Sequence, residues 1–140
     1  MSRFWLKMIG NHERPCPEYY TKDWVESRRR MHRIRPGDHM ILYAVGASKR
    51  VFALAHVTSE VHPSGNPDWP YQVDISYLVN LPVSSGVSIN DISTSERDLV
   101  RPIQWGASYI ELRPKEFYEQ AAALLRVAAG SAESAPSPPR

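Results

Sequence analysis

Two apolar runs in the middle of the chain give the clearest hydrophobic pattern, Met40–Val45 and Val51–Val57. Near-continuous apolar runs of this length are typical of strands covered on both faces. The polar segment 46–50 between them has the length of a hairpin loop. Pro36-Gly37, just before the first run, favours a type II turn, because proline presets φ and glycine accepts a positive φ. The pattern therefore predicts a central β-hairpin.

Three further segments are expected to form strands. Phe4–Ile9 is a short aromatic and aliphatic run, and glycine follows it. Residues 71–77 alternate Tyr, Val, Ile and Tyr with polar residues, which predicts a strand with one wet face that continues toward Pro82. Residues 105–112 are predicted to form the last strand. The cluster of turn-forming residues at 62–68 predicts a loop.

Helices are expected at three places. Thr21 is a suitable N-cap for a helix over about 22–32, and the polar segment 89–99 is expected to hold one short helix. Pro114 opens a third helix, since apolar residues follow it at helical spacing. From Gly130 the chain is rich in Ser, Ala and Pro, which predicts a disordered tail over 130–140 after one domain over 1–129.

The order of these elements is β, α, β, β, β, α, β, α. It predicts an α+β fold with a mixed, mostly antiparallel and partly closed barrel. About five to six strands and two to three flanking helices are expected.

Composition narrows the class of protein. A chain of 140 residues is the size of one domain, and it holds no run of about 18 apolar residues that would span a membrane. The first residues lack the layout of a signal peptide, and the single cysteine, Cys16, fits a reducing compartment. We therefore expect a cytoplasmic protein.

Signals for catalysis are weak. The five histidines are scattered without a metal-ligand spacing. Cys16 lies between two prolines, and nothing else in the sequence marks a base for it. Phosphate-binding, dinucleotide and nucleophile-elbow motifs are absent. The sequence thus favours a non-catalytic protein without a metal or cofactor.

The tryptophan and arginine residues say more about the function than the candidate catalytic residues do. Trp24 precedes an arginine-rich stretch at 28–35, Trp69 stands where a polar loop meets a strand, and Trp105 precedes a glycine. Nucleobases are held by stacking on aromatic faces, and phosphates by Lys and Arg. Packing in the core and a solvated arginine face are the alternatives that the sequence leaves open.

Four motifs in order resemble the EVE domain, a PUA-like family related to the YTH domains. They are Phe4-Trp5-Leu6 followed by Asn11; Trp24 before the basic stretch and Pro36-Gly37-Asp38; Asp68-Trp69-Pro70-Tyr71 at the start of a strand; and Trp105-Gly106 followed by Pro114-Lys115-Glu116-Phe117. Together they span most of residues 3–125.

The resemblance implies a pocket for a modified base, such as methylated or hydroxymethylated cytosine or methylated adenine, in DNA or RNA. Aromatic walls are expected from Trp24 with Trp69 or Trp105. The other residues expected at the base are Gly10, Asn11, Ser27 and Tyr71. Phosphates are expected to contact Lys22, Arg28, Arg29, Arg30 and Arg33. A base in duplex DNA has to be flipped out to enter.

The expected protein is a monomeric reader of modified nucleic acid, with any nuclease or modification enzyme as a separate chain. Two alternatives from other classes remain. One is a small ASCH-like enzyme acting on nucleic acid or modified nucleosides. The other is a protein-interaction module of a restriction or modification system.

Overall fold

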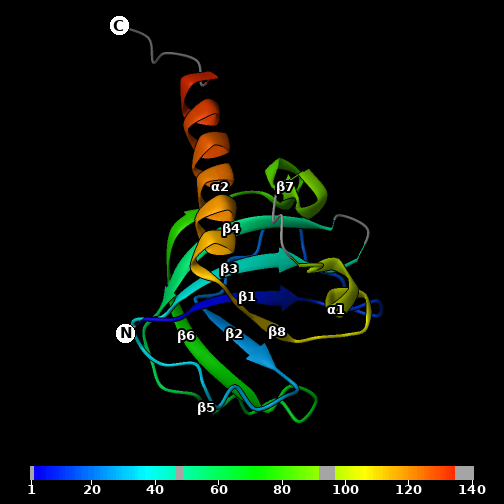
Figure 1. Ribbon diagram of the computed structural model, residues 1–140. Helices are drawn as coiled ribbons and strands as arrows, with labels where there is room; N and C mark the ends of the chain where they lie inside the picture. Colours follow the sequence, from blue (N-terminus) through cyan, green and yellow to red (C-terminus); the bar gives the residue numbers. More distant parts are fainter. Residues whose placement is uncertain (1, 47–48, 92–96, 135–140) are drawn as a thin grey trace, which may run out of the picture.

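A curved sheet forms most of the molecule in the computed structural model, which describes residues 2–46, 49–91 and 97–134 (Figure 1). The long strands are β1 (Phe4–Ile9), β2 (Trp24–Ser27), β3 (His39–Ala44), β4 (Arg50–Val57), β6 (Tyr71–Asn80) and β8 (Tyr109–Leu112). Two-residue strands β5 (His62–Pro63) and β7 (Val87–Ser88) pair with β6 and β4. The α-helices are α1 (Val100–Gln104) and α2 (Pro114–Ser134), and short 3-10 helices span Val83–Ser85 and Ile89–Asp91.

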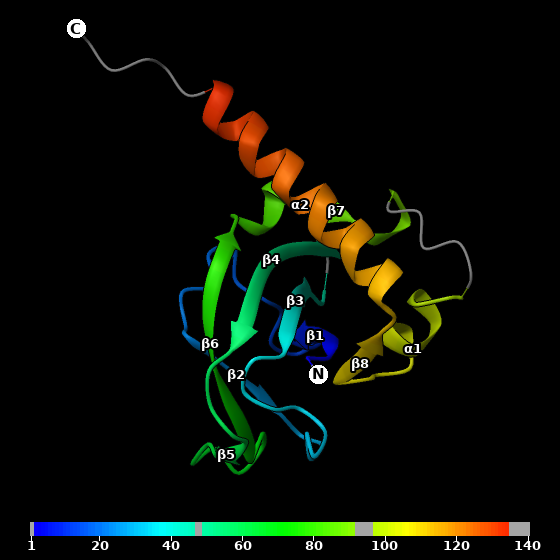
Figure 2. The same cartoon turned by 60° about the vertical axis from the view of Figure 1, so that its left-hand side comes forward.

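The strands follow the order β2-β6-β4-β3-β1-β8 across the sheet. Only β1 and β3 pair in parallel among the described strands, and the other pairs are antiparallel. Figure 2 shows the sheet curving from β8 through β3 and β4 to β6 and β2. The described residues therefore form an α+β half-barrel of six long strands with two α-helices, which confirms the predicted fold class.

Both faces of the central strands are buried, as the two apolar runs predicted. Met40 and Leu42 of β3 point into an interior core with Trp5 and Phe52. Ile41 lies in a second core on the outer face, where Phe117 and Leu124 of α2 cover it. Successive side chains of the central strands therefore pack alternately into the two cores, one on each face of the sheet.

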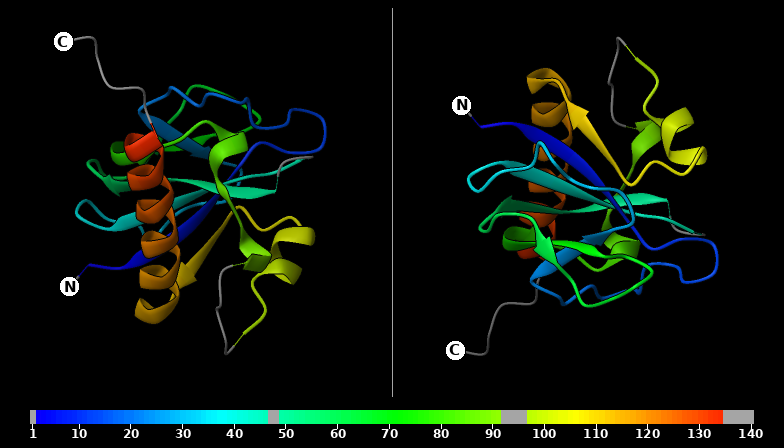
Figure 3. Two further views of the ribbon diagram at one scale, coloured as in Figure 1. Left: turned by 90° about the horizontal axis from the view of Figure 1, so that it is seen from above. Right: turned by 90° about the horizontal axis from the view of Figure 1, so that it is seen from below.

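Helix α2 crosses the outer face of the sheet, and its C-terminal turns project beyond the strands (Figures 1 and 3). Its first turn is fixed by Glu116, whose Oε1 accepts hydrogen bonds from the backbone N–H of Arg113 at 2.7 Å and from Arg97 at 2.8 Å. Phe117 stacks on Phe4 with ring centroids 4.5 Å apart. These contacts join α2 to the start of β1.

Pro36-Gly37 forms the predicted turn. Gly37 has φ +89°, and the Asp38 N–H donates to the Arg35 carbonyl oxygen at 3.1 Å. The buried carboxylate of Asp38 then accepts three N–H groups: Arg3 N–H at 3.0 Å, Arg35 N–H at 3.0 Å and the Trp5 indole Nε1–H at 2.9 Å. Asp38 therefore fixes the turn to β1.

The helix predicted over 22–32 is wrong. Residues 24–27 form the edge strand β2, which pairs with Tyr71–Asp74 of β6, and residues 28–38 form turns and irregular backbone. Val25 and Ser27 are buried while Trp24 and Glu26 are partly exposed. This alternation over four residues is too short to outweigh a helix signal in the sequence, and pairing with β6 decides the structure.

The C-terminal third departs from the expectations in two smaller ways. Trp105 caps α1 instead of opening the last strand, which begins at Tyr109. Helix α2 continues to Ser134, so residues 130–134 of the predicted tail are helical. Residues 135–140 lie outside the described residues, as does part of the polar segment in which one short helix was expected. No helix in the described part of the chain is both long and apolar enough to cross a membrane.

Gln120 of α2 is buried, and both its side-chain Nε2 and Oε1 lack a hydrogen-bond partner within the described residues. Because an unpaired buried amide is destabilising, Gln120→Leu is expected to raise the free energy of unfolding by about 1–2 kcal/mol. Urea unfolding measures this change, and Gln104→Leu at the exposed end of α1 is the control. A loss of stability in Gln120→Leu would show that the amide is satisfied in solution.

Candidate nucleic-acid interface

Residues 28–35, the basic segment, lie across the open side of the half-barrel between its edge strands β2 and β8. Met31 and Ile34 are both 0% exposed and pack into the interior core. The Tyr109 hydroxyl donates to the Arg30 carbonyl oxygen at 2.8 Å, and the Arg33 guanidinium contacts Glu111 at 3.1 Å. These anchors turn apolar side chains inward and leave the arginines on the outside.

Trp24 lies on β2, with Lys22 above its ring at 5.7 Å from the centroid. Its indole Nε1–H donates to Glu26 Oε1 at 3.2 Å, and Asn66 Nδ2 donates to Glu26 Oε2 at 3.2 Å. The carboxylate of Glu26 therefore joins Trp24 to the loop that carries Trp69.

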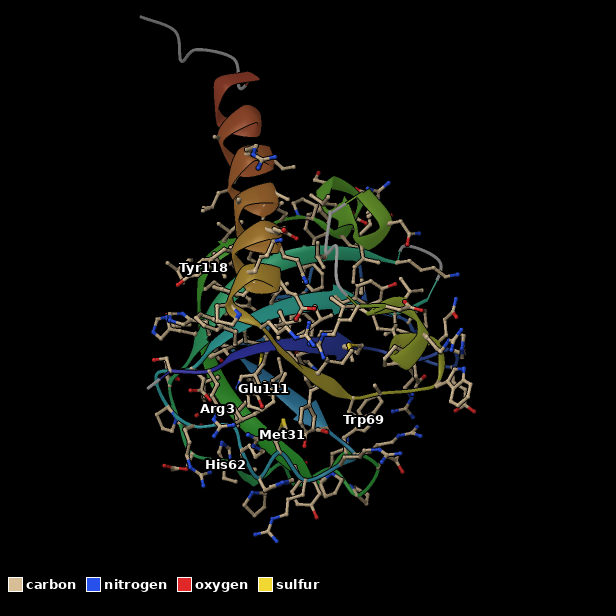
Figure 4. All side chains as sticks on the ribbon, viewed as in Figure 1. Arg3, Met31, His62, Trp69, Glu111 and Tyr118 are labelled. Atoms are coloured by element: carbon tan, nitrogen blue, oxygen red, sulfur yellow. The ribbon has the colours of Figure 1, made fainter. Side chains whose placement is uncertain are left out.

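Arg28 and Trp69 form the second pairing of a cation with an indole. The Arg28 guanidinium carbon is 5.9 Å from the centroid of the Trp69 ring, and Figure 4 shows Trp69 below α1. A guanidinium over an indole face stabilises by about 0.5–1 kcal/mol at an exposed site. Four predicted residues, Lys22, Trp24, Arg28 and Trp69, thus lie along β2 and the loop after β5.

A cleft of about 540 Å³ opens beside this surface, where the basic segment faces β5 and the start of β6. Its apolar lining consists of Met31, Val61, Pro63, Pro70 and Tyr71. Met31 and His62 lie in the lower part of Figure 4, on the far side of the sheet from α2. Arg30 and Tyr71 are the residues of the predicted site that line it.

Charged and polar side chains line the rest of the cleft: Arg30, Arg35, His32, His62 and Glu60. Arg35 and Glu60 are 3.9 Å apart, both largely exposed, so this ion pair is weak. His62 places Nε2 at 3.2 Å from Asp74 Oδ1 and Nδ1 at 3.2 Å from the Pro63 carbonyl oxygen. Both ring nitrogens of His62 therefore face oxygen atoms that accept hydrogen bonds.

Other predicted site residues lie apart from the cleft. Trp105 is 84% exposed at the end of α1. Gly10 has φ +87°, and a Cβ there would be 2.5 Å from the Cys16 nitrogen, so it forms a tight turn. Asn11 accepts the Arg14 N–H at 2.7 Å in that turn, while buried Ser27 accepts the Arg29 N–H at 3.1 Å. Arg29 itself is exposed.

Sequence reasoning did not select eight of the ten residues that line the cleft, which are Met31, His32, Arg35, Glu60, Val61, His62, Pro63 and Pro70. Arg35 belongs to the arginine-rich stretch, which was a usable signal. Met31 and His32 lie in the same stretch, and Pro70 belongs to the motif Asp68-Trp69-Pro70-Tyr71, whereas no local pattern places residues 60–63 against the basic segment.

Groups suited to catalysis are few within the described residues. No cluster of three metal-ligating side chains occurs there. Burial, together with the charge of Glu18, raises the pKa of the Cys16 thiol to about 11, so the thiol is protonated at neutral pH. Burial lowers the pKa of Lys7 to about 7, with the charge of Glu26 opposing the shift. The Lys7 amine is enclosed in the interior and donates to the Met8 carbonyl oxygen at 2.7 Å.

The geometry defines an α+β half-barrel with a cationic, partly apolar cleft on the side away from α2. No family model matches the chain, and no curated protein does.

Solved structures do share the fold. Protein Atu2648 from Agrobacterium tumefaciens matches with a TM-score of 0.56 at 18% identity, over 99% of this chain and 100% of that one. Rpa0253 from Rhodopseudomonas palustris has a TM-score of 0.57 at 14% identity, over 86% and 92% of the two chains. A hypothetical protein from Leishmania major has a TM-score of 0.56 at 13% identity, over 94% and 98%. At these identities the likeness concerns the fold.

Proposed function

We propose that this protein is a non-catalytic module that binds nucleic acid and holds a modified nucleobase in the cleft between the basic segment and β5–β6. The observation that carries the proposal is the cleft itself, about 540 Å³ with an apolar lining and Arg30 and Arg35 at its edge. The resemblance of four sequence motifs to the EVE domain supports the same function and favours a methylated or hydroxymethylated base.

The lining of the cleft suits the parts of a nucleotide. Tyr71, Pro70 and Val61 offer a surface for a planar base, and an added methyl group gains apolar contact there without needing a hydrogen bond. Arg30 and Arg35 are placed to contact the phosphates on either side of that base. A base enters such a cleft from a single strand, or from a duplex after flipping.

Two neighbouring side chains extend the binding surface along the bound nucleic-acid strand. Trp69 directly precedes Pro70, and Arg28 lies two positions before Arg30. Displacing the Arg28 guanidinium exposes the Trp69 ring to a second base, and stacking of a base on an aromatic ring stabilises by about 1–3 kcal/mol. Arg28 then becomes available for a phosphate.

A titration followed by tryptophan fluorescence tests the proposal. Short single-stranded and duplex oligonucleotides each carry 5-methylcytosine, 5-hydroxymethylcytosine, N6-methyladenine or no modification, and the titration is run at several salt concentrations. Preferential binding of one modified base is expected. Equal binding of all the oligonucleotides would show that the protein binds nucleic acid without recognising a modified base. No binding would refute the proposal.

The double variant Arg30→Ala/Arg35→Ala is expected to weaken binding of the preferred oligonucleotide by about tenfold or more. Each lost contact to a single-strand phosphate also reduces the slope of log K against log salt by about 0.7. The control, Arg14→Ala/Arg101→Ala, removes the same charge from exposed positions that do not line the cleft. Equal losses in the two double variants would contradict the assignment of the cleft.

A further inference from the structure

Helix α2 has a second apolar row, on its outward side, formed by Tyr118, Ala122, Leu125 and Ala129. Tyr118 is 62% exposed and Leu125 is 50% exposed. The row that faces the sheet, with Phe117, Ala121 and Leu124, already supplies the contacts to the outer core. The Tyr118 ring also contacts Phe4 and Phe117, with centroids 5.7 Å and 5.6 Å apart. A helix packed against one surface needs one apolar row, so the exposed part of the second row is unexplained by the fold of a single chain.

The spacing of the second row is that of a helix–helix seam. Its residues follow at intervals of four, three and four, which is the spacing of the core positions in a coiled coil. Large side chains alternate with alanine along the row. When such a helix pairs with a copy of itself in the antiparallel direction, Tyr118 and Leu125 of one copy face Ala129 and Ala122 of the other. Large residues then fill the space beside small ones.

Charges beside the row fit the same arrangement. Glu119 and Arg126 flank it and lie seven positions apart, too far to pair within one helix. Glu119 is partly buried, and its Oε2 is enclosed without a hydrogen-bond partner among the described residues, while exposed Arg126 has no ion pair there. An antiparallel pair brings Glu119 of each copy opposite Arg126 of the other. The two-fold symmetry forms this contact twice.

We propose that the protein forms a homodimer through antiparallel pairing of the outward row of α2. The projecting C-terminal turns of α2 leave room for a second helix, and Figure 4 labels Tyr118 at the side of α2. The sequence-based expectation was a monomer, which no structural observation tests. In this dimer both clefts remain open, because they lie across the sheet from α2.

Sedimentation velocity over a wide range of protein concentration is the test, with the full chain. The wild type is expected to shift from monomer to dimer. Leu125→Glu is expected to remain a monomer, and Trp105→Glu, which adds the same charge at the exposed residue that caps α1, is expected to dimerise as the wild type does. Circular dichroism establishes that both variants are folded.

Exchanging the charges of Glu119 and Arg126 tests whether the two helices pair in the antiparallel direction. Glu119→Arg alone and Arg126→Glu alone place like charges opposite each other, and each is expected to raise the dimer dissociation constant about tenfold. The double variant Glu119→Arg/Arg126→Glu restores opposite charges and is expected to restore dimerisation. A wild type that stays monomeric, a dimer that persists in Leu125→Glu, or a double variant no better than the single ones would overturn the proposal.

Discussion

Replacing Asp38 with alanine is expected to lower the free energy of unfolding by about 3–5 kcal/mol. The carboxylate is buried and accepts the N–H groups of Arg3 and Arg35 and the indole N–H of Trp5. The substitution leaves the Trp5 N–H without a partner in the interior core, where that residue is 1% exposed. It also removes the side-chain oxygen that accepts the Arg35 N–H in the turn over residues 35–38. Urea unfolding measures the change.

Two further substitutions separate this explanation from a general effect of lost charge. Asp38→Asn keeps one carbonyl acceptor and is expected to be less destabilising than Asp38→Ala. Asp68→Ala, in an exposed turn, is expected to leave stability within about 0.5 kcal/mol of the wild type. A comparably small effect of Asp38→Ala would mean that water replaces the carboxylate, and the assigned anchor would be wrong.

Replacing Lys7 with methionine is expected to raise stability at pH 7 by about 2–4 kcal/mol. Burial lowers the pKa of the Lys7 amine to about 7 in the folded protein, from 10.5 when unperturbed. Below pH 7 both folded and unfolded chains carry the proton, and at pH 7 about half of the folded chains still do, so the folded state holds a charge inside the barrel. Methionine has a similar length and removes that charge, while it also loses the hydrogen bond to the Met8 carbonyl.

The same pKa shift predicts how stability depends on pH. Above about pH 7 the folded chain releases the Lys7 proton while the unfolded chain keeps it until about pH 10.5, so the unfolded state binds more protons. Stability therefore rises with pH in this window, by up to about 1.4 kcal/mol per unit from this one group. Burial raises the pKa of Tyr77 to about 12, so its ionisation lies above the window.

Urea unfolding at several pH values between about 7 and 9 measures the rise, and the Lys7→Met profile is expected to be flatter than that of the wild type. Lys49→Met, at an exposed lysine, is the control and is expected to follow the wild type. A wild-type stability that stays constant over this range, together with an unchanged Lys7→Met profile, would show that the amine reaches water and keeps its ordinary pKa.

The sequence correctly predicted the helices and strands whose conformation follows from the pattern of their own residues. The runs at 40–45 and 51–57 became β3 and β4, and Pro114 opens α2. Trp24–Ser27 was missed because its partner strand, Tyr71–Asp74, comes from far along the chain, and four residues carry little periodicity of their own.

The candidate site was harder to predict for the same reason. The cleft combines the basic segment with residues 60–63 and 70–71, and pairing of β5 with β6 brings these together. Its arginines were visible as a run in the sequence, whereas His62 and Glu60 acquire their positions only in the fold. Lys7 gave a local signal, being the only charge inside the apolar run Phe4–Ile9, although its burial depends on the strands around it.

The position of β1 has a consequence for synthesis on the ribosome. β1 is made before both strands that it pairs with, β3 on one side and β8, far along the sequence, on the other. The edge of β1 that pairs with residues 109–112 therefore stays open until those residues have emerged. Open strand edges pair readily with other chains. Nascent chains stalled before residue 109 are expected to be the species most prone to aggregation and most in need of chaperones.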